Sequence, residues 1–161
     1  MRAAPVLDHK EGLMEQPIDV ARDSIDAFNA DDWDRVRNLH SADYHEEEFA
    51  TGRTSEGIDA ALDVAQGWKR GFPDAKGTVT GAYGDGSVAV LEIDWHGTNS
   101  GPMRTRDGEE MPATGREVTV HACQVFEVED GKIKQSRHYF DLMSMLSQLG
   151  VGAEAQAGAT R

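Results

Sequence analysis

The sequence predicts an α+β fold in which a cone of N-terminal helices packs in a curved, mainly antiparallel sheet. Two observations support this prediction. Apolar residues in the first half recur with helical spacing, whereas the second half alternates between apolar and polar residues and is divided by turn residues. Helices followed by a run of antiparallel strands are typical of α+β proteins. A long sheet folded over helices leaves a conical space between the two layers, and we expect that space to be a pocket.

Three helices are predicted in the first half. Apolar residues from Ile18 to Phe28 step by three and four, and Asp31-Asp32 can cap a short second helix. Residues 43–49 then form a short extended segment. The third helix begins near Ser55 and ends at Phe72, because the proline that follows disfavours helical geometry at the residue before it.

The second half predicts four long strands and one last helix. Residues 78–83 and 87–95 form one hairpin, and residues 117–128 and 133–140 form another. A polar loop, 103–114, separates them. Leucines at helical spacing follow, and Gly150 is well placed to end that helix. We therefore expect one domain over residues 18–150, with a flexible leader (1–17) and a flexible tail (151–161).

Composition excludes several classes of function. The 29 acidic and 16 basic side chains give a formal net charge of −13, which disfavours nucleic acid and anionic membranes as partners. No apolar run is long enough to span a bilayer, and the N-terminus lacks the apolar core of a signal peptide, so we expect a cytoplasmic protein. A lone cysteine, Cys123, excludes an internal disulfide. No spaced metal-ligand motif is present, and we expect no metal.

The strand at 117–128 carries a polar residue on its apolar face. Its even positions from Val118 to Val128 are apolar except for Gln124 in the middle. A buried amide without hydrogen-bond partners costs about 1–3 kcal/mol, so Gln124 either satisfies a neighbour or faces a ligand cavity. Phe126 lies on the same face and is expected to contact the ligand.

The register of the second hairpin decides what stands opposite Gln124. A two-residue loop would place Arg137 opposite it, whereas a three-residue loop with Gly131 in the left-handed conformation would place Ser136 there and His138 opposite Ala122. The glycine favours the second register, which puts His138 and Gln124 on one face. An imidazole with a pKa near neutrality suits general acid–base catalysis, and a buried structural histidine is the alternative.

Three further groups of residues are candidates for the site. In the segment 44–48 the alternation places Tyr44, Glu46 and Glu48 on one face, of which we expect Tyr44 and Glu46 to point inward. Glu46 would orient the imidazole or share its proton. Asp141 precedes the last helix, where it can act as an N-cap or take a catalytic part beside His138. Trp68, Trp95 and Phe140 are expected to form aromatic walls of the pocket.

Five segments in order resemble one known family: GWKRGFPD (67–74), WHGTNSG (95–101), MPATGREVTV (111–120), VFEVEDGKI (125–133) and YFDLMSMLSQLG (139–150). The chain resembles, over about residues 18–150, the SnoaL-like polyketide cyclase, or ester cyclase-like, family of the nuclear-transport-factor-2-like fold. The resemblance implies a homodimer through the open sheet face and no cofactor. It also implies an intramolecular aldol reaction that closes the last ring of aromatic polyketide esters.

The resemblance also implies which positions carry the chemistry. The catalytic aspartate of the family lies three residues before the aspartate that heads the last helix, and that position is His138 here. The family's histidine corresponds to Gln124, its glutamine to Ala122 and its early asparagine to Glu46. The acid–base residue of this chain therefore departs from that of the family.

These observations predict a cofactor-free enzyme that performs acid–base chemistry on a hydrophobic, carbonyl-bearing ring compound. Cyclisation, isomerisation, dehydration and hydrolysis all need the same polar groups in an apolar cone. A non-catalytic protein that binds a hydrophobic small molecule in that cone is the alternative, because the same fold serves both functions.

Overall fold

The computed structural model describes residues 16–105 and 107–151. The expected leader up to residue 15 and the tail from residue 152 lie outside these residues. The helices are α1 (Pro17–Asn29), α2 (Trp33–Leu39), α3 (Ile58–Gly71) and α4 (Leu142–Leu149). None of these described helices is long and apolar enough to cross a membrane.

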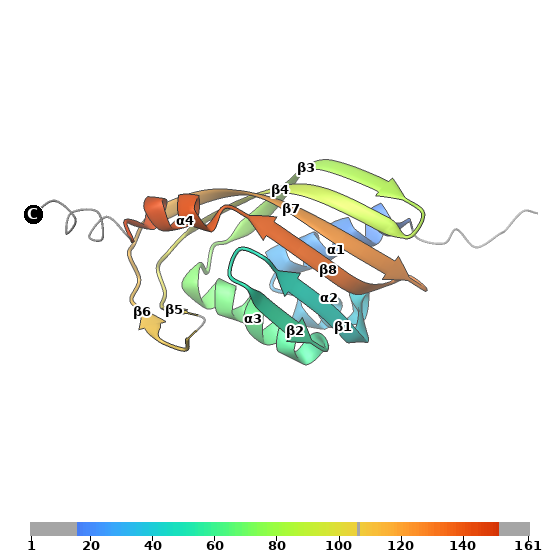
Figure 1. Cartoon of the computed structure of the whole chain (residues 1–161), viewed down its shortest axis with the longest axis horizontal. Helices are drawn as coiled ribbons and strands as arrows, with labels where there is room; N and C mark the ends of the chain where they lie inside the picture. Colours follow the sequence, from blue (N-terminus) through green and yellow to red (C-terminus); the bar gives the residue numbers. More distant parts are fainter. Residues whose placement is uncertain (1–15, 106, 152–161) are drawn as a thin grey trace, which may run out of the picture.

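The sheet is mainly antiparallel and curved, as predicted. Its six strands follow the order β2-β1-β8-β7-β4-β3, and β1–β8 is its parallel pair. Figure 1 shows the sheet curving over α1 and α3, with α4 and a separate β5–β6 hairpin at one end. The strand bounds are β1 His40–Glu48, β2 Arg53–Glu56, β3 Lys76–Asp85, β4 Val88–Thr98, β5 Met103–Arg104, β6 Glu110–Met111, β7 Glu117–Glu129 and β8 Lys132–Phe140.

The helices begin and end close to the predicted positions, with one correction. Asp32 caps α2 by accepting a hydrogen bond from the backbone N–H of Arg35, and α3 ends just before Phe72. The expected start of α3 at Ser55 is wrong, because Arg53–Glu56 pairs with β1 as β2. The chain then turns at Gly57, whose φ of 83° favours glycine, and α3 follows.

The β7–β8 hairpin has a register that neither sequence-based alternative describes. Asp130 and Gly131 both have positive φ, 52° and 71°, which is typical of a two-residue type I′ turn. A bulge at Lys134 then adds one residue to β8, so that Gln124 pairs with His138 rather than with Arg137 or Ser136. The expectation that His138 and Gln124 share a face is nevertheless confirmed.

Two apolar clusters hold the layers together. The first and larger cluster joins the helices to the middle of the sheet and includes Val20, Ile25 and Leu91. The second lies where α4 covers β7 and includes Val118 and Leu149. Trp95 packs against both clusters. Residues of both clusters line one cavity between the sheet and the helices.

Asn99, fully buried, ties the end of α3 to the loop that precedes β7. Its Nδ2 donates to the carbonyl oxygens of Gly71 (3.1 Å) and Gly101 (3.0 Å), and its Oδ1 accepts from the backbone N–H of Thr114 at 2.8 Å. These bonds hold the chain against the end of α3, beside the cavity residues Trp68 and Phe72.

Candidate functional site

The cavity has a volume of about 180 Å³ and an asymmetric lining. Helices α1, α2 and α3 contribute mostly apolar side chains, whereas the polar groups come mainly from β1, β7 and β8. Most of the side chains predicted to form the site line it: Tyr44, Glu46, Trp68, Trp95, Gln124, His138 and Phe140.

Phe126 and Asp141 do not line the cavity, so Phe126 is not the predicted ligand contact, and Asp141 is the predicted N-cap rather than a catalytic residue. Phe126 is 1% exposed and packs in the larger apolar cluster, because α1 covers that part of the sheet. Asp141 caps α4: its Oδ1 accepts a hydrogen bond from the backbone N–H of Ser144 at 3.0 Å. Its carboxylate is exposed and lies beside Tyr139 in a shallow depression outside the cavity.

His138 lies in the middle of a polar row that crosses three adjacent strands. Its neighbours are Gln124 on β7 and Glu48 on β1. Nδ1 lies 4.0 Å from Oε2 of Glu48, and Nε2 is buried with no hydrogen-bond partner among the described residues. Burial lowers the pKa of His138, and the nearby carboxylate of Glu48 opposes that effect. The ring is therefore neutral at neutral pH, and a proton on Nδ1 is favoured because that nitrogen faces the carboxylate.

Glu48 was not among the residues expected in the site, although strand alternation places it on the face of Tyr44 and Glu46. It is 3% exposed and bound from several sides. Thr51 Oγ1 donates to one carboxylate oxygen, and Trp68 Nε1 donates to the other at 3.1 Å. A guanidinium nitrogen of Arg53 lies 3.8 Å from the first oxygen. These contacts hold the carboxylate of Glu48 beside His138.

Glu46 lies two residues before Glu48 and has a different environment. It pairs with Ser136 in the parallel ladder, one row away from His138. No described residue forms a hydrogen bond or ion pair with its carboxylate. Burial raises the pKa of Glu46 to about 7, and repulsion from Glu48 contributes to the rise. Glu48, rather than the predicted Glu46, is therefore the carboxylate that faces the imidazole.

A chain of hydrogen bonds joins the buried polar groups behind these residues. Gln124 Nε2 donates to Ser136 Oγ at 3.2 Å, and Ser136 Oγ is hydrogen-bonded to the Tyr44 hydroxyl at 2.5 Å. Gln124 thus satisfies a neighbour and also lines the cavity. Burial raises the pKa of Tyr44 well above its usual value, so the hydroxyl keeps its proton.

His40 also lines the cavity, which no pattern in the sequence indicated. Its ring packs edge-on against Tyr44, with the centroids 4.5 Å apart. Burial lowers the pKa of His40 to about 4, so the ring is neutral. Nδ1 lies 2.7 Å from the carbonyl oxygen of Val36 and therefore donates to it.

Trp95 supplies a second buried polar atom that no group of the described residues satisfies. Its indole Nε1 is buried and has no hydrogen-bond partner among the described residues. The Trp95 ring lies 6.5 Å from the ring of His138 and 5.1 Å from that of Phe28, measured between centroids. Two residues of the cavity lining thus carry a buried nitrogen without a partner in the described part of the chain, one an N–H donor and one in an imidazole.

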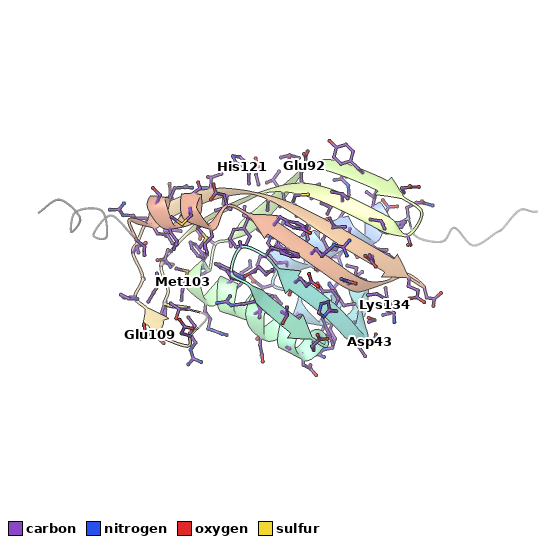
Figure 2. The ribbon with its side chains drawn as sticks, in the orientation of Figure 1. Asp43, Glu92, Met103, Glu109, His121 and Lys134 are labelled. Atoms are coloured by element: carbon purple, nitrogen blue, oxygen red, sulfur yellow. The ribbon has the colours of Figure 1, made fainter. Side chains whose placement is uncertain are left out.

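The outer face of the sheet has ordinary surface chemistry. Figure 2 shows His121 and Glu92 on the side of the sheet away from α3, and His121 Nδ1 lies 2.6 Å from Asp94. His45 lies between Glu47 and Glu56, which raise its pKa by hydrogen bonding. Within residues 16–105 and 107–151, no group of three or more His, Cys, Asp and Glu side chains is arranged to hold a metal ion.

A comparison with protein families decides the assignment. The profile of the SnoaL-like polyketide cyclase family matches residues 18–149, nearly the whole described domain. This chain belongs to that family. No curated protein sequence matches the chain.

Solved structures agree with the family assignment. A candidate polyketide cyclase, IdmH from Streptomyces antibioticus, is 27% identical, with a TM-score of 0.71 over 84% of this chain and 99% of that chain. A candidate SnoaL-like polyketide cyclase from a Jannaschia species is 20% identical, with a TM-score of 0.75 over 92% and 96%. A Catenulispora acidiphila protein with a ketosteroid isomerase-like fold, solved with trimethylamine, is 18% identical, with a TM-score of 0.70 over 84% and 95%.

Proposed function

We propose that this member of the SnoaL-like family is a cofactor-free cyclase that removes a proton next to a carbonyl group of a hydrophobic ring compound. The observation that carries the proposal is a pair of buried atoms without a partner among the described residues, Trp95 Nε1 and His138 Nε2, on two side chains that line the cavity. One can donate to a carbonyl oxygen, and the other can accept the proton from the adjacent carbon. The 27% identity to the Streptomyces antibioticus protein supports a cyclase-like role.

His138 is the base in the first step. Nε2 takes the proton, and the electron pair of the broken C–H bond moves to the carbonyl oxygen to form an enolate. Trp95 Nε1 and the second amide N–H of Gln124 are the donors for the developing negative charge. Glu48 faces Nδ1 and stabilises the imidazolium that forms, so it acts through His138 rather than on the substrate.

The second step forms the ring. The enolate carbon attacks another carbonyl carbon of the same molecule, a C–C bond forms, and the new alkoxide takes the proton back from His138. No electrons are gained or lost, and no co-reactant is needed. A neutral imidazole is the base here, so the reaction should slow when His138 becomes protonated. The resemblance to the family implies an aspartate at this position in other cyclases.

Deuterium exchange tests the first step without the natural substrate. A hydrophobic ring ketone, β-tetralone, is incubated with the protein in D₂O, and the loss of its α-proton signals is followed by NMR. We expect wild type to accelerate exchange and His138→Gln to lose the acceleration. His121→Gln is the matched control, because His121 is exposed on the other face of the sheet.

The outcomes separate catalysis from simple binding. Wild-type exchange no faster than that with His138→Gln would overturn the assignment of His138 as a base. If β-tetralone still bound in that case, with quenching of tryptophan fluorescence, the alternative of a non-catalytic binding protein would replace the proposal.

We also propose that two copies associate through the open face of the sheet. Tyr139 points to that face, is 40% exposed and stacks on Phe49 with the ring centroids 4.7 Å apart. Sedimentation of wild type should give a dimer, and Tyr139→Glu should shift it toward monomer. A wild-type monomer at micromolar concentration would contradict the proposal.

A further inference from the structure

The proposed mechanism gives no role to the carboxyl group of Glu46, a half-buried side chain that lines the cavity. Glu48 is hydrogen-bonded to Thr51 and Trp68 and faces Arg53, so its charge is already compensated. Glu46 has no such contacts among the described residues, although it lines the same cavity. A carboxylate at the wall of an apolar cavity is unfavourable without a cation or donor unless a ligand supplies one.

The rest of the lining makes a ligand cation the fitting partner. No lysine or arginine is among the residues that line the cavity, and both of its histidines with lowered pKa values, His40 and His138, are neutral at neutral pH. The walls carry several aromatic rings, whose faces attract cations. These rings belong to Phe28, Tyr44, Trp68, Phe72, Trp95 and Phe140.

We propose that the ligand of this cavity is a hydrophobic compound with a protonated amine that pairs with the Glu46 carboxylate. The amine gains a charge-assisted hydrogen bond, and the ring system contacts the aromatic wall. A ligand with a free carboxylate is rejected, since it would meet the Glu46 carboxylate and no lysine or arginine lines the cavity to offset the repulsion. The inference rests on the proposed function for the cavity being a ligand site, and it adds the class of compound.

Amine binding has a defined dependence on pH. The free protein holds Glu46 with a pKa of about 7, and the ammonium pairs only with the ionised form. Raising the pH from 6 to 8 should therefore tighten amine binding about tenfold. The titratable and charged groups around Glu46 are His40, Tyr44, His45 and Glu48 of β1, Arg53 and Glu56 of β2 and His138 of β8. The helices contribute no charged side chain to the cavity lining.

Three probes with one ring system test the proposal by calorimetry: naphthylmethylamine, naphthylmethanol and naphthoate. We expect the amine at pH 8 to bind at least about tenfold more tightly than the alcohol, which corresponds to ~1.4 kcal/mol, and naphthoate to bind most weakly. Glu46→Gln should abolish the preference for the amine while alcohol binding continues. Glu47→Gln is the matched control, because Glu47 pairs with His45 on the other face of β1.

Each other outcome would overturn the inference. An alcohol that binds as tightly as the amine would remove Glu46 as a ligand contact but leave the cavity and the proposed function intact. An amine preference that survives Glu46→Gln would place the contact elsewhere. Failure of all three probes to bind would refute an aryl-amine site, and the deuterium exchange assay would still decide the role of His138 separately.

Discussion

Glu46→Gln should stabilise the protein, and the gain should grow as the pH rises. The folded protein raises the pKa of Glu46 from 4.5 to about 7, so between these values the folded state binds a proton that the unfolded state has lost. Stability therefore falls as pH increases through this range. The difference from 4.5 to about 7, at about 1.4 kcal/mol per pH unit, corresponds to at most about 3.4 kcal/mol. Glutamine resembles the neutral acid in shape and avoids this loss.

The assay is urea denaturation of both proteins at pH 5 and pH 8, followed by circular dichroism. We expect the variant to exceed wild type in the free energy of unfolding by about 1 kcal/mol at pH 5 and about 3 kcal/mol at pH 8. The comparison is made between the two proteins at each pH because His40 acts in the opposite direction. Its pKa is lowered to about 4, so protonation of the unfolded chain below the usual value of 6.5 destabilises the fold on acidification.

Two results would refute the reasoning. A stability difference that is equal at pH 5 and pH 8 would mean that Glu46 ionises normally in the folded protein. A variant less stable than wild type at pH 8 would mean that the carboxylate has a stabilising partner. Glu47→Gln should not exceed wild type in stability at pH 8, because Glu47 is half-buried at the surface and pairs with His45.

Three other substitutions test the geometry. Glu48→Gln should lower the pKa of His138 further, because two charges 4.0 Å apart attract by about 4 kcal/mol at an effective dielectric constant of about 20. An NMR titration of His138 that is unchanged in the variant would contradict this contact. Phe126→Ala should lower the free energy of unfolding by about 3–5 kcal/mol, measured by urea denaturation. The milder Phe126→Leu should leave the binding of naphthylmethanol unchanged, and weaker binding would mean that Phe126 is part of the cavity wall. Asn99→Ala should lower the free energy of unfolding by about 3 kcal/mol, because the carbonyl of Gly71 and the N–H of Thr114 lose their hydrogen-bond partner. An unchanged midpoint of thermal unfolding would contradict that role.

The fold could be predicted from the sequence because its signals are local. Helical spacing, the Asp32 cap, the proline after Phe72 and the glycine-containing turns each depend on a few neighbouring residues. The start of α3 was placed too early because β2 is only four residues long and is defined by pairing with β1. The bulge at Lys134 was not predicted either, since a single extra residue in a strand leaves no pattern in the sequence.

The candidate site was less predictable because it depends on contacts between distant segments. Alternation grouped Glu46 with Glu48, but Trp68 and Arg53, which distinguish them, come from α3 and β2. Phe126 was placed on the correct face of β7 but in the wrong part of it. Helix α1 covers the part of the β7 face that carries Phe126, so this part is packed core. The part that carries Gln124 lines the cavity, and only the position of α1 distinguishes the two.

The parallel pairing of β1 with β8 sets a minimum length for any ligand that reaches both Glu46 and His138. Glu46 aligns with Ser136 and Glu48 with His138, so the two functional rows are separated by two residues along the strands. At about 3.3 Å per residue, that separation is about 7 Å. A single six-membered ring with adjacent substituents is too short to contact both rows at once. The strand pairing therefore favours ligands with fused or linked rings whose two polar groups lie at opposite ends.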